Sequence, residues 1–204
     1  MTDSNVPPAP QPAYRIDAIT SQGAYASGLI IIHSRDEFMI DFVTSFASPP
    51  RIVGRVITSP PHIKNMLRAL LENTKRYEEA YGPIPDQPKN TPPKPEKASD
   101  LYAKLQIADE LLGGTFSNSM IIKHTRDVFI MDFLTNFPPA PKVTARLIVS
   151  PAQIRSIIST LDGNLSQYEK RFGKIEDIAQ ADQQMRVSLN WLSSVGSSDL
   201  LHRG

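Results

Sequence analysis

Histidine, arginine and aspartate recur at matching places in two ten-residue segments, HSRDEFMIDF from His33 and HTRDVFIMDF from His124. A histidine close to carboxylates is a combination used in both general acid–base catalysis and metal binding. His33 or His124 could therefore act as a general base, and His33 could bind a metal ion together with Asp36 and Asp41. The duplication also allows a structural interpretation, in which these side chains maintain the contacts of a repeated unit.

The duplication extends far beyond these ten residues. Residues 25–84 align without a gap with residues 116–175, at a constant offset of 91, and about 22 of the 60 aligned pairs are identical. An ungapped match of this length indicates a true internal repeat. The identical pairs with polar side chains include His33/His124, Asp36/Asp127, Asp41/Asp132, Arg55/Arg146, Ser59/Ser150, Asn73/Asn164 and Tyr77/Tyr168.

Each repeat predicts the same succession of elements. A short extended segment leads to strand LIIIH or MIIKH, a polar turn, strand FMIDFVTSF or FIMDFLTNF, a proline-rich loop, and strand RIVGRVIT or KVTARLIV. A helix follows, with Ser59 or Ser150 as its N-cap and Gly82 or Gly173 at its end. The predicted fold class is α+β. Each of the two units is a three- or four-stranded antiparallel sheet followed by one C-terminal helix packed on one face, and together they form a pseudo-twofold dimer within the chain.

Proline-rich segments mark the domain boundaries. Residues 1–13 predict a disordered tail, 14–84 the first ββββα unit, 85–100 a proline-rich linker, 101–175 the second ββββα unit, and 176–204 an amphipathic helix with a loose end. A linker rich in proline and poor in apolar residues is extended and has no core. The C-terminal segment has apolar residues at helical spacing, namely Ile178, Ala181, Met185, Leu189 and Leu192.

Strand alternation places the charged residues on one face of each sheet. Asp41 shares a face with Arg55, and Asp132 with Arg146, opposite to the more apolar face that we assign to the helix. We therefore predict structural ion pairs Asp41–Arg55 and Asp132–Arg146 across neighbouring strands. His33 falls on the opposite face from Asp41, which disfavours the metal site. Apolar residues flank the charges, so the charged face should be covered, by the other repeat or by a second chain.

Five residues are candidates for interaction rather than catalysis. We interpret His33 and His124 as strand-end histidines bonded to the following turn, because the hairpin offers no pocket for catalysis. Asn73 and Asn164 lie in mid-helix, where asparagine often contacts a loop, the sister unit or a ligand. Trp191, the only tryptophan, lies off the apolar stripe of its helix and either anchors a partner or packs on the sheets. We assign no catalytic, cofactor-binding or metal-binding residue.

Composition narrows the classes of function. The chain of 204 residues has a formal charge of +1, which gives no bulk attraction to nucleic acid or anionic lipid. It has no cysteine, which excludes disulfides, thiolate metal sites and cysteine nucleophiles. The N-terminus does not have the pattern of a signal peptide and no apolar run has membrane-spanning length, so we expect a soluble, cytoplasmic protein. The sequence contains no phosphate loop, dinucleotide fingerprint, nucleophile elbow or zincin motif.

Both repeats carry a set of motifs at fixed spacing. In the second unit the residues are Phe116–Asn118, His124, Phe129, Asp132, Phe133, Arg146, Ser150, Pro151, Asn164, Tyr168, Glu169 and Gly173. In the first unit they are Tyr25, His33, Glu37, Phe38, Asp41, Phe42, Arg55, Ser59, Pro60, Asn73, Tyr77, Glu78 and Gly82. Over roughly three quarters of the chain, this pattern resembles a bacterial and archaeal family of short proteins of unknown function, the DUF3467 type.

The resemblance implies an architecture but no activity. Members typically read G-x-Y-[SA]-N, then H-S-x-x-E-F-x-x-D-F, S-R-[VI]-I-x-[ST]-P-x-x-A-K and N-x-x-x-[YF]-E-x-x-[FY]-G. The first copy here departs from the pattern at Ser27, where the family usually has asparagine. The family usually occurs as a single unit, so the resemblance implies the tandem fusion of a self-associating unit. It brings no established catalytic or ligand-binding residues.

We expect a non-enzymatic protein-binding or assembly module of unknown pathway, built from two fused copies of a self-associating unit. The alternative is a small enzyme or ligand-binding protein with a site between the two units, lined by His33/His124 or by Asp41/Arg55 and their counterparts. A nucleic-acid-associated protein ranks below both, because acidic residues dilute the basic side of the first helix. We expect a protein partner or self-association, no membrane partner and no cofactor.

Overall fold

The computed structural model describes residues 14–85 and 97–176. The first unit contains α1 (Ala18–Gln22), β1 (Ala24–Tyr25), β2 (Gly28–His33), β3 (Phe38–Thr44), β4 (Arg51–Thr58) and α2 (Pro60–Tyr81). The second contains α3 (Ala98–Tyr102), β5 (Gln106–Ile107), the 3-10 helix η1 (Asp109–Leu111), β6 (Thr115–Phe116), β7 (Ser119–His124), β8 (Phe129–Thr135), β9 (Lys142–Val149) and α4 (Pro151–Phe172). The α+β fold with two similar units is confirmed. The predicted N-terminal tail, most of the linker and the C-terminal helix lie outside the described residues.

Three consecutive strands form an antiparallel meander in each unit. β3 pairs with β2 and β4 in the first unit, and β8 pairs with β7 and β9 in the second. Inward residues of β3 are almost fully buried, with Phe38 at 0% and Phe42 at 2% exposure. Alternation along the strand therefore separates an apolar face from the face that carries Asp41.

The short strands of each unit pair with the sheet of the other unit. β1 pairs in parallel with β9, and β5 and β6 pair in parallel with β4. The sheets are therefore mixed, and the prediction of purely antiparallel sheets is wrong at these strands. The physical reason is that the chain crosses from one sheet to the other without reversing its direction. The crossing is seen at Ala26 and Ser27, since the Ala26 N–H donates to the carbonyl of Ile148 and the Ser27 N–H donates to the carbonyl of Val43.

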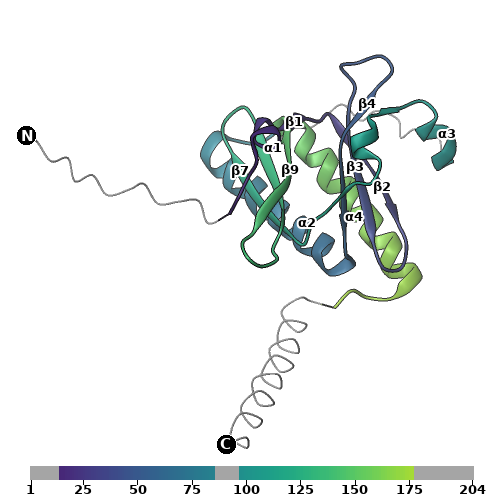
Figure 1. Cartoon of the computed structure of the whole chain (residues 1–204). Coiled ribbons are helices and arrows are strands. Elements are labelled where there is room, and N and C mark those ends of the chain that lie inside the picture. Colours follow the sequence, from purple (N-terminus) through teal and green to yellow (C-terminus); the bar gives the residue numbers. More distant parts are fainter. Residues whose placement is uncertain (1–13, 86–96, 177–204) are drawn as a thin grey trace, which may run out of the picture.

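The two long helices are also exchanged between the units. α2 packs on β7 and on α4, whereas α4 packs on β2. Figure 1 shows the green helix α4 beside the strands of the first unit. The Tyr77 hydroxyl of α2 donates to the carbonyl of Arg126 at 2.8 Å, and the Tyr168 hydroxyl of α4 donates to the carbonyl of Arg35 at 2.6 Å. Each apolar sheet face is thus covered by the helix of its sister unit.

The helix ends follow the sequence signals only in part. Ser59 and Ser150 occupy the N-cap positions, but neither side chain caps the backbone. The Ser59 hydroxyl instead lies 2.6 Å from Nδ1 of His62. Gly82 and Gly173 end the helices with φ values of 89° and 96°, a region that glycine tolerates because it lacks a Cβ atom.

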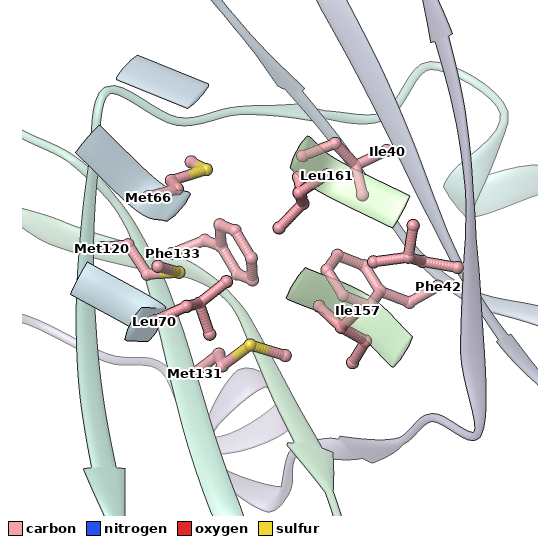
Figure 2. A pocket seen from close by; sticks show the side chains of 10 residues that line it. Ile40, Phe42, Met66, Leu70, Met120, Met131, Phe133, Ile157 and Leu161 are labelled. Atoms are coloured by element: carbon pink, nitrogen blue, oxygen red, sulfur yellow. The ribbon is translucent and has the colours of Figure 1, made fainter. Parts of the chain in front are cut away.

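The hydrophobic core lies where the two units meet. Figure 2 shows side chains from both hairpins and both long helices converging on one small cavity. The cavity has a volume of about 10 Å³, and the ring centroids of Phe42 and Phe133 lie 5.5 Å apart beside it. The lining residues are Leu29, Ile40, Phe42, Met66, Leu70, Met120, Met131, Phe133, Ile157 and Leu161. A cavity this small, with an apolar lining, offers a water molecule no hydrogen-bond partner, so the hydrophobic core between the units is closely packed.

Among the described residues, no helix combines the length and the apolar character needed to cross a membrane.

Candidate functional site

The structure brings together the charged residues that the sequence placed on one face. Asp41 lies directly opposite Arg55, whose Nε and Nη2 atoms donate to the two carboxylate oxygens at 2.7 and 2.9 Å. Arg146 donates in the same way to Asp132, at 2.6 and 2.9 Å. This bidentate geometry matches the planar guanidinium fork to a carboxylate. The hydrogen bonds from Arg55 to Asp41, and from Arg146 to Asp132, raise the pKa of each guanidinium.

Both ion pairs are also tied to the other unit. Arg55 Nη1 donates to the carbonyl of Leu112 at 2.9 Å, and Arg146 Nη1 donates to the carbonyl of Ser21 at 3.1 Å. Each of these carbonyls belongs to the segment that precedes the first long strand of the opposite repeat. The sister repeat therefore covers the charged face, and each arginine links three segments of the fold.

The surroundings of the two carboxylates differ in detail. Asp41 is 0% and Asp132 is 1% exposed. The Tyr102 hydroxyl of α3 donates to Asp41, and burial together with this bond raises the pKa of Tyr102 well above its usual range. In the second unit, by contrast, the hydroxyl of Tyr14 accepts a hydrogen bond from Lys123 of β7 at 2.9 Å. Both carboxylates are thus built into the structure and are not open to a substrate.

His33 belongs to an aromatic cluster shared between the units. Its ring centroid lies 5.1 Å from that of Phe38, 5.6 Å from Tyr168 and 6.3 Å from Phe172. Its Nδ1 atom is buried and makes no hydrogen bond within the described residues, whereas the backbone of Ser34, in the following turn, interacts with the ring. Burial, and then the positive charge of Arg171, lower the pKa of His33 below its ordinary value of 6.5.

His124 occupies the equivalent cluster in the second unit. Its ring centroid lies 5.4 Å from Phe129, 5.7 Å from Tyr77 and 6.2 Å from Tyr81. Its buried Nδ1 atom likewise has no hydrogen-bond partner in the described part of the chain. Within residues 14–85 and 97–176, no group of three or more histidine, aspartate or glutamate side chains could hold a metal ion.

The mid-helix asparagines make local contacts. The side-chain amides of Asn73 and Asn164 donate to the carbonyls of Ala69 and Thr160, each at 2.9 Å, one helical turn earlier. Within the described residues, neither amide group therefore makes the tertiary contact that we expected, because a carbonyl of its own helix is within reach. Trp191 lies outside the described residues.

One groove does lie between the units and includes both arginines. It has a volume of about 300 Å³ and runs along the line where β4 meets β9. Arg55 and Arg146 line it from the two sides, together with the adjacent Gly54 and Ala145, which are equivalent in the repeat. The histidines are not among its lining residues.

Sequence reasoning missed a pair of exposed aromatic contacts. The rings of Tyr25 and Phe46 lie 5.5 Å apart, and the rings of Phe116 and Phe137, at the equivalent positions of the repeat, lie 5.9 Å apart and are stacked. Phe46 is 81% and Phe137 is 54% exposed. We call these the aromatic pads. The signal that could have found them is the identical phenylalanine at the end of both predicted strands, directly before a proline-rich loop.

Comparison with known proteins agrees with the repeat. The family model described as a protein of unknown function (DUF3467) matches the chain twice, at residues 1–86 and 85–177. The chain therefore belongs to the DUF3467 family, as a tandem duplication of its unit. No curated protein and no solved structure matches the chain.

Proposed function

We propose that the chain is a non-enzymatic protein-binding module that presents two equivalent binding surfaces. The observation that carries the proposal is the exposure of both aromatic pads. Large aromatic side chains that stay exposed at two equivalent places are typical of surfaces that bind proteins. The pads recur because the unit recurs, so the fused chain would bind with two points of attachment.

The burial of the polar candidates supports the same proposal. Asp41 and Asp132 satisfy arginines inside the fold, and the histidine rings pack among aromatic rings. The hydrophobic core between the units holds a cavity of only about 10 Å³. These side chains stabilise the assembly of the two units, which leaves the exterior as the surface for partners.

The proposal is tested by cross-linked affinity capture with the tagged full-length chain. We expect the wild type to recover a partner, the Phe46→Ser/Phe137→Ser double variant to lose it, and each single variant to bind more weakly. Two points of attachment can exceed the affinity of either one by about 10²–10⁴-fold. Leu71→Ser is the matched control, because Leu71 is also a large exposed apolar residue, at 52%, but belongs to neither pad.

Recovery of the same partner by the double variant would contradict the role of the pads. Capture with a chain that ends at Ile175 separates any contribution of residues 176–204. If wild type, truncated chain and control all recover no specific partner, the binding-module proposal loses its support.

A second candidate function rests on the groove between β4 and β9. Two arginines on opposite sides of a groove of about 300 Å³ would suit a small ligand with a hydrogen-bond acceptor at each end. Binding is tested by the melting temperature of the wild type with a panel of small dicarboxylates. A ligand in the groove raises the melting temperature of the wild type, and Ile19→Trp, which narrows the groove rim, reduces that increase.

A further inference from the structure

A second, larger groove lies between α2 and the first residues of β7. It has a volume of about 840 Å³, and its apolar lining includes Met66, Ala69, Met120 and Phe137. β7 is the last strand of its sheet, so the groove opens at the sheet edge. A long hollow beside a helix and a strand, with apolar side chains in it, has the form of a site for an amphipathic helix.

The second unit does not repeat the chemistry of this groove. Every α2 residue that lines it differs from its equivalent in α4. Arg68 and Glu72, for example, correspond to Ser159 and Gly163. The buried polar contacts between the units, such as those of Tyr77 and Tyr168, are by contrast identical in the two copies. Because this groove chemistry occurs only beside α2, the groove suits a segment that occurs once in the chain and not in each repeat.

The C-terminal segment is present once and begins beside this groove. Lys64 of α2 donates to the carbonyl of Ile175 at 3.0 Å, which holds the end of the second unit against α2. A hollow of about 290 Å³ is lined by Ile175, Glu176 and Pro61. Pro61 also lines the large groove. The described chain thus ends, at Glu176, near the N-terminal end of α2, where the large groove begins.

We propose that residues 177–192 dock in this groove as an amphipathic helix, parallel to α2 and in the same molecule. The apolar stripe of Ile178, Ala181, Met185, Leu189 and Leu192 faces the groove. The proposal does not rest on partner binding by the aromatic pads. Because Phe137 also lines the groove, a docked segment would compete with a partner for the second pad. A segment tethered at the mouth of a groove has a high effective concentration there, so even a weak contact is occupied.

Charge complementarity supports this direction and register. Two helices that run in parallel rise equally per residue, so a register set at their start is maintained along them. Counted from Ile175 and Pro61, which line the same hollow, Asp182 lies level with Arg68 and Arg186 lies level with Glu72. Both pairs then have opposite charges, which an antiparallel helix starting at the same point would not provide.

Disulfide trapping tests the occupant, because the chain has no cysteine of its own. We combine Ala69→Cys with Ala181→Cys or Met185→Cys in the otherwise intact chain. The matched control is Thr160→Cys with the same partners, since Thr160 is the half-buried equivalent of Ala69 on α4. A disulfide forms only when the two Cα atoms approach within about 7 Å. We expect an intramolecular disulfide in at least one Ala69→Cys pair, at a rate independent of protein concentration, and none in the controls.

Three outcomes overturn the proposal or part of it. Equal yields from the Ala69→Cys and Thr160→Cys pairs would show that the segment does not prefer the groove. Disulfide-linked dimers that increase with concentration would assign the groove to a second copy. Arg68→Glu should lower the yield and added Asp182→Arg should restore it, whereas Ser159→Glu should have no effect. Failure of the double variant to restore the yield would contradict the parallel register.

Discussion

The buried polar contacts between the two repeats are the same in both copies, whereas the exposed side of α2 and that of α4 have diverged. Asp41–Arg55 recurs as Asp132–Arg146, and the bond from Tyr77 to Arg126 recurs as that from Tyr168 to Arg35. The large groove beside α2 lacks a chemically equivalent surface on α4.

The physical reason lies in the exchange of strands and helices. Each unit supplies the helix and the short strands that complete the other unit's sheet, so each contact type is used twice about the pseudo-twofold axis. A buried polar residue at such a position must match its partner in the other unit. A residue on an exposed helix face has no partner to match, and the exposed faces are where the two copies differ in chemistry.

Separating the units should have the largest effect. We expect a fragment of residues 1–90 to fold only as a dimer, because its apolar sheet face and its helix α2 both need a sister unit. Circular dichroism and light scattering check this expectation, and a folded monomer would contradict the exchange. As a control, the full chain with a protease site inserted after Lys89 should remain a folded complex of its two fragments after cleavage.

Removing one buried carboxylate should have the next largest effect. We expect Asp41→Ala to lower the free energy of unfolding by about 3–5 kcal/mol, because it leaves the Arg55 charge without its partner. Asp132→Ala should cost less, since the Arg146 side chain is 21% exposed and that of Arg55 only 11%. Urea unfolding measures both values.

A double variant separates the stranded charge from a loss of packing. Asp41→Leu combined with Arg55→Met replaces both partners by apolar groups, which often restores stability. We expect this variant to unfold at a higher urea concentration than Asp41→Ala. An equal or lower midpoint would mean that the bonds of Arg55 to Leu112 and of Tyr102 to Asp41 matter more than the charge pair.

The tyrosine hydroxyl bonds between the units should contribute smaller and matched amounts. Tyr77→Phe and Tyr168→Phe each remove one hydrogen bond to a carbonyl of the opposite hairpin and keep the ring contacts. A loss of about 0.5–1.5 kcal/mol is expected for each, by urea unfolding. Clearly unequal losses would show that the pseudo-symmetry does not extend to the energies.

The pH dependence from His33 should be the smallest effect. Burial and Arg171 lower its pKa in the folded chain below 6.5, so the unfolded chain binds the proton more readily. The resulting stability is complete above pH 6.5 and is lost as the pH falls towards the lowered pKa. Urea midpoints between pH 7.5 and about pH 5 should therefore decrease less in His33→Phe than in the wild type. Parallel pH profiles would contradict this role.

Sequence patterns predicted the strands and helices, and the sheet face on which the charged side chains lie, because both depend on residues close together in the sequence. The strand period of two residues places Asp41 and Arg55 on one face, and register then sets them opposite each other. The same reasoning could not predict the local bonds of Asn73 and Asn164, since several acceptors competed for each amide. It also missed the aromatic pads, because a strand or loop pattern does not reveal how far a side chain stays exposed.

The sequence by itself determined that the chain contains two copies of one α+β unit, with an apolar face and a charged face on each sheet. Only the tertiary structure decided which copy covers which face. The helical period predicts that each helix packs on an apolar sheet face, but the sheet of its own unit and the sheet of the sister unit have almost the same apolar pattern. In the structure each long helix packs on the sheet of its sister unit, where the Tyr77 and Tyr168 hydroxyls bond to carbonyls of the opposite hairpin. The short strand β1 is exchanged at Ala26 and Ser27, where consecutive N–H groups bond to different units.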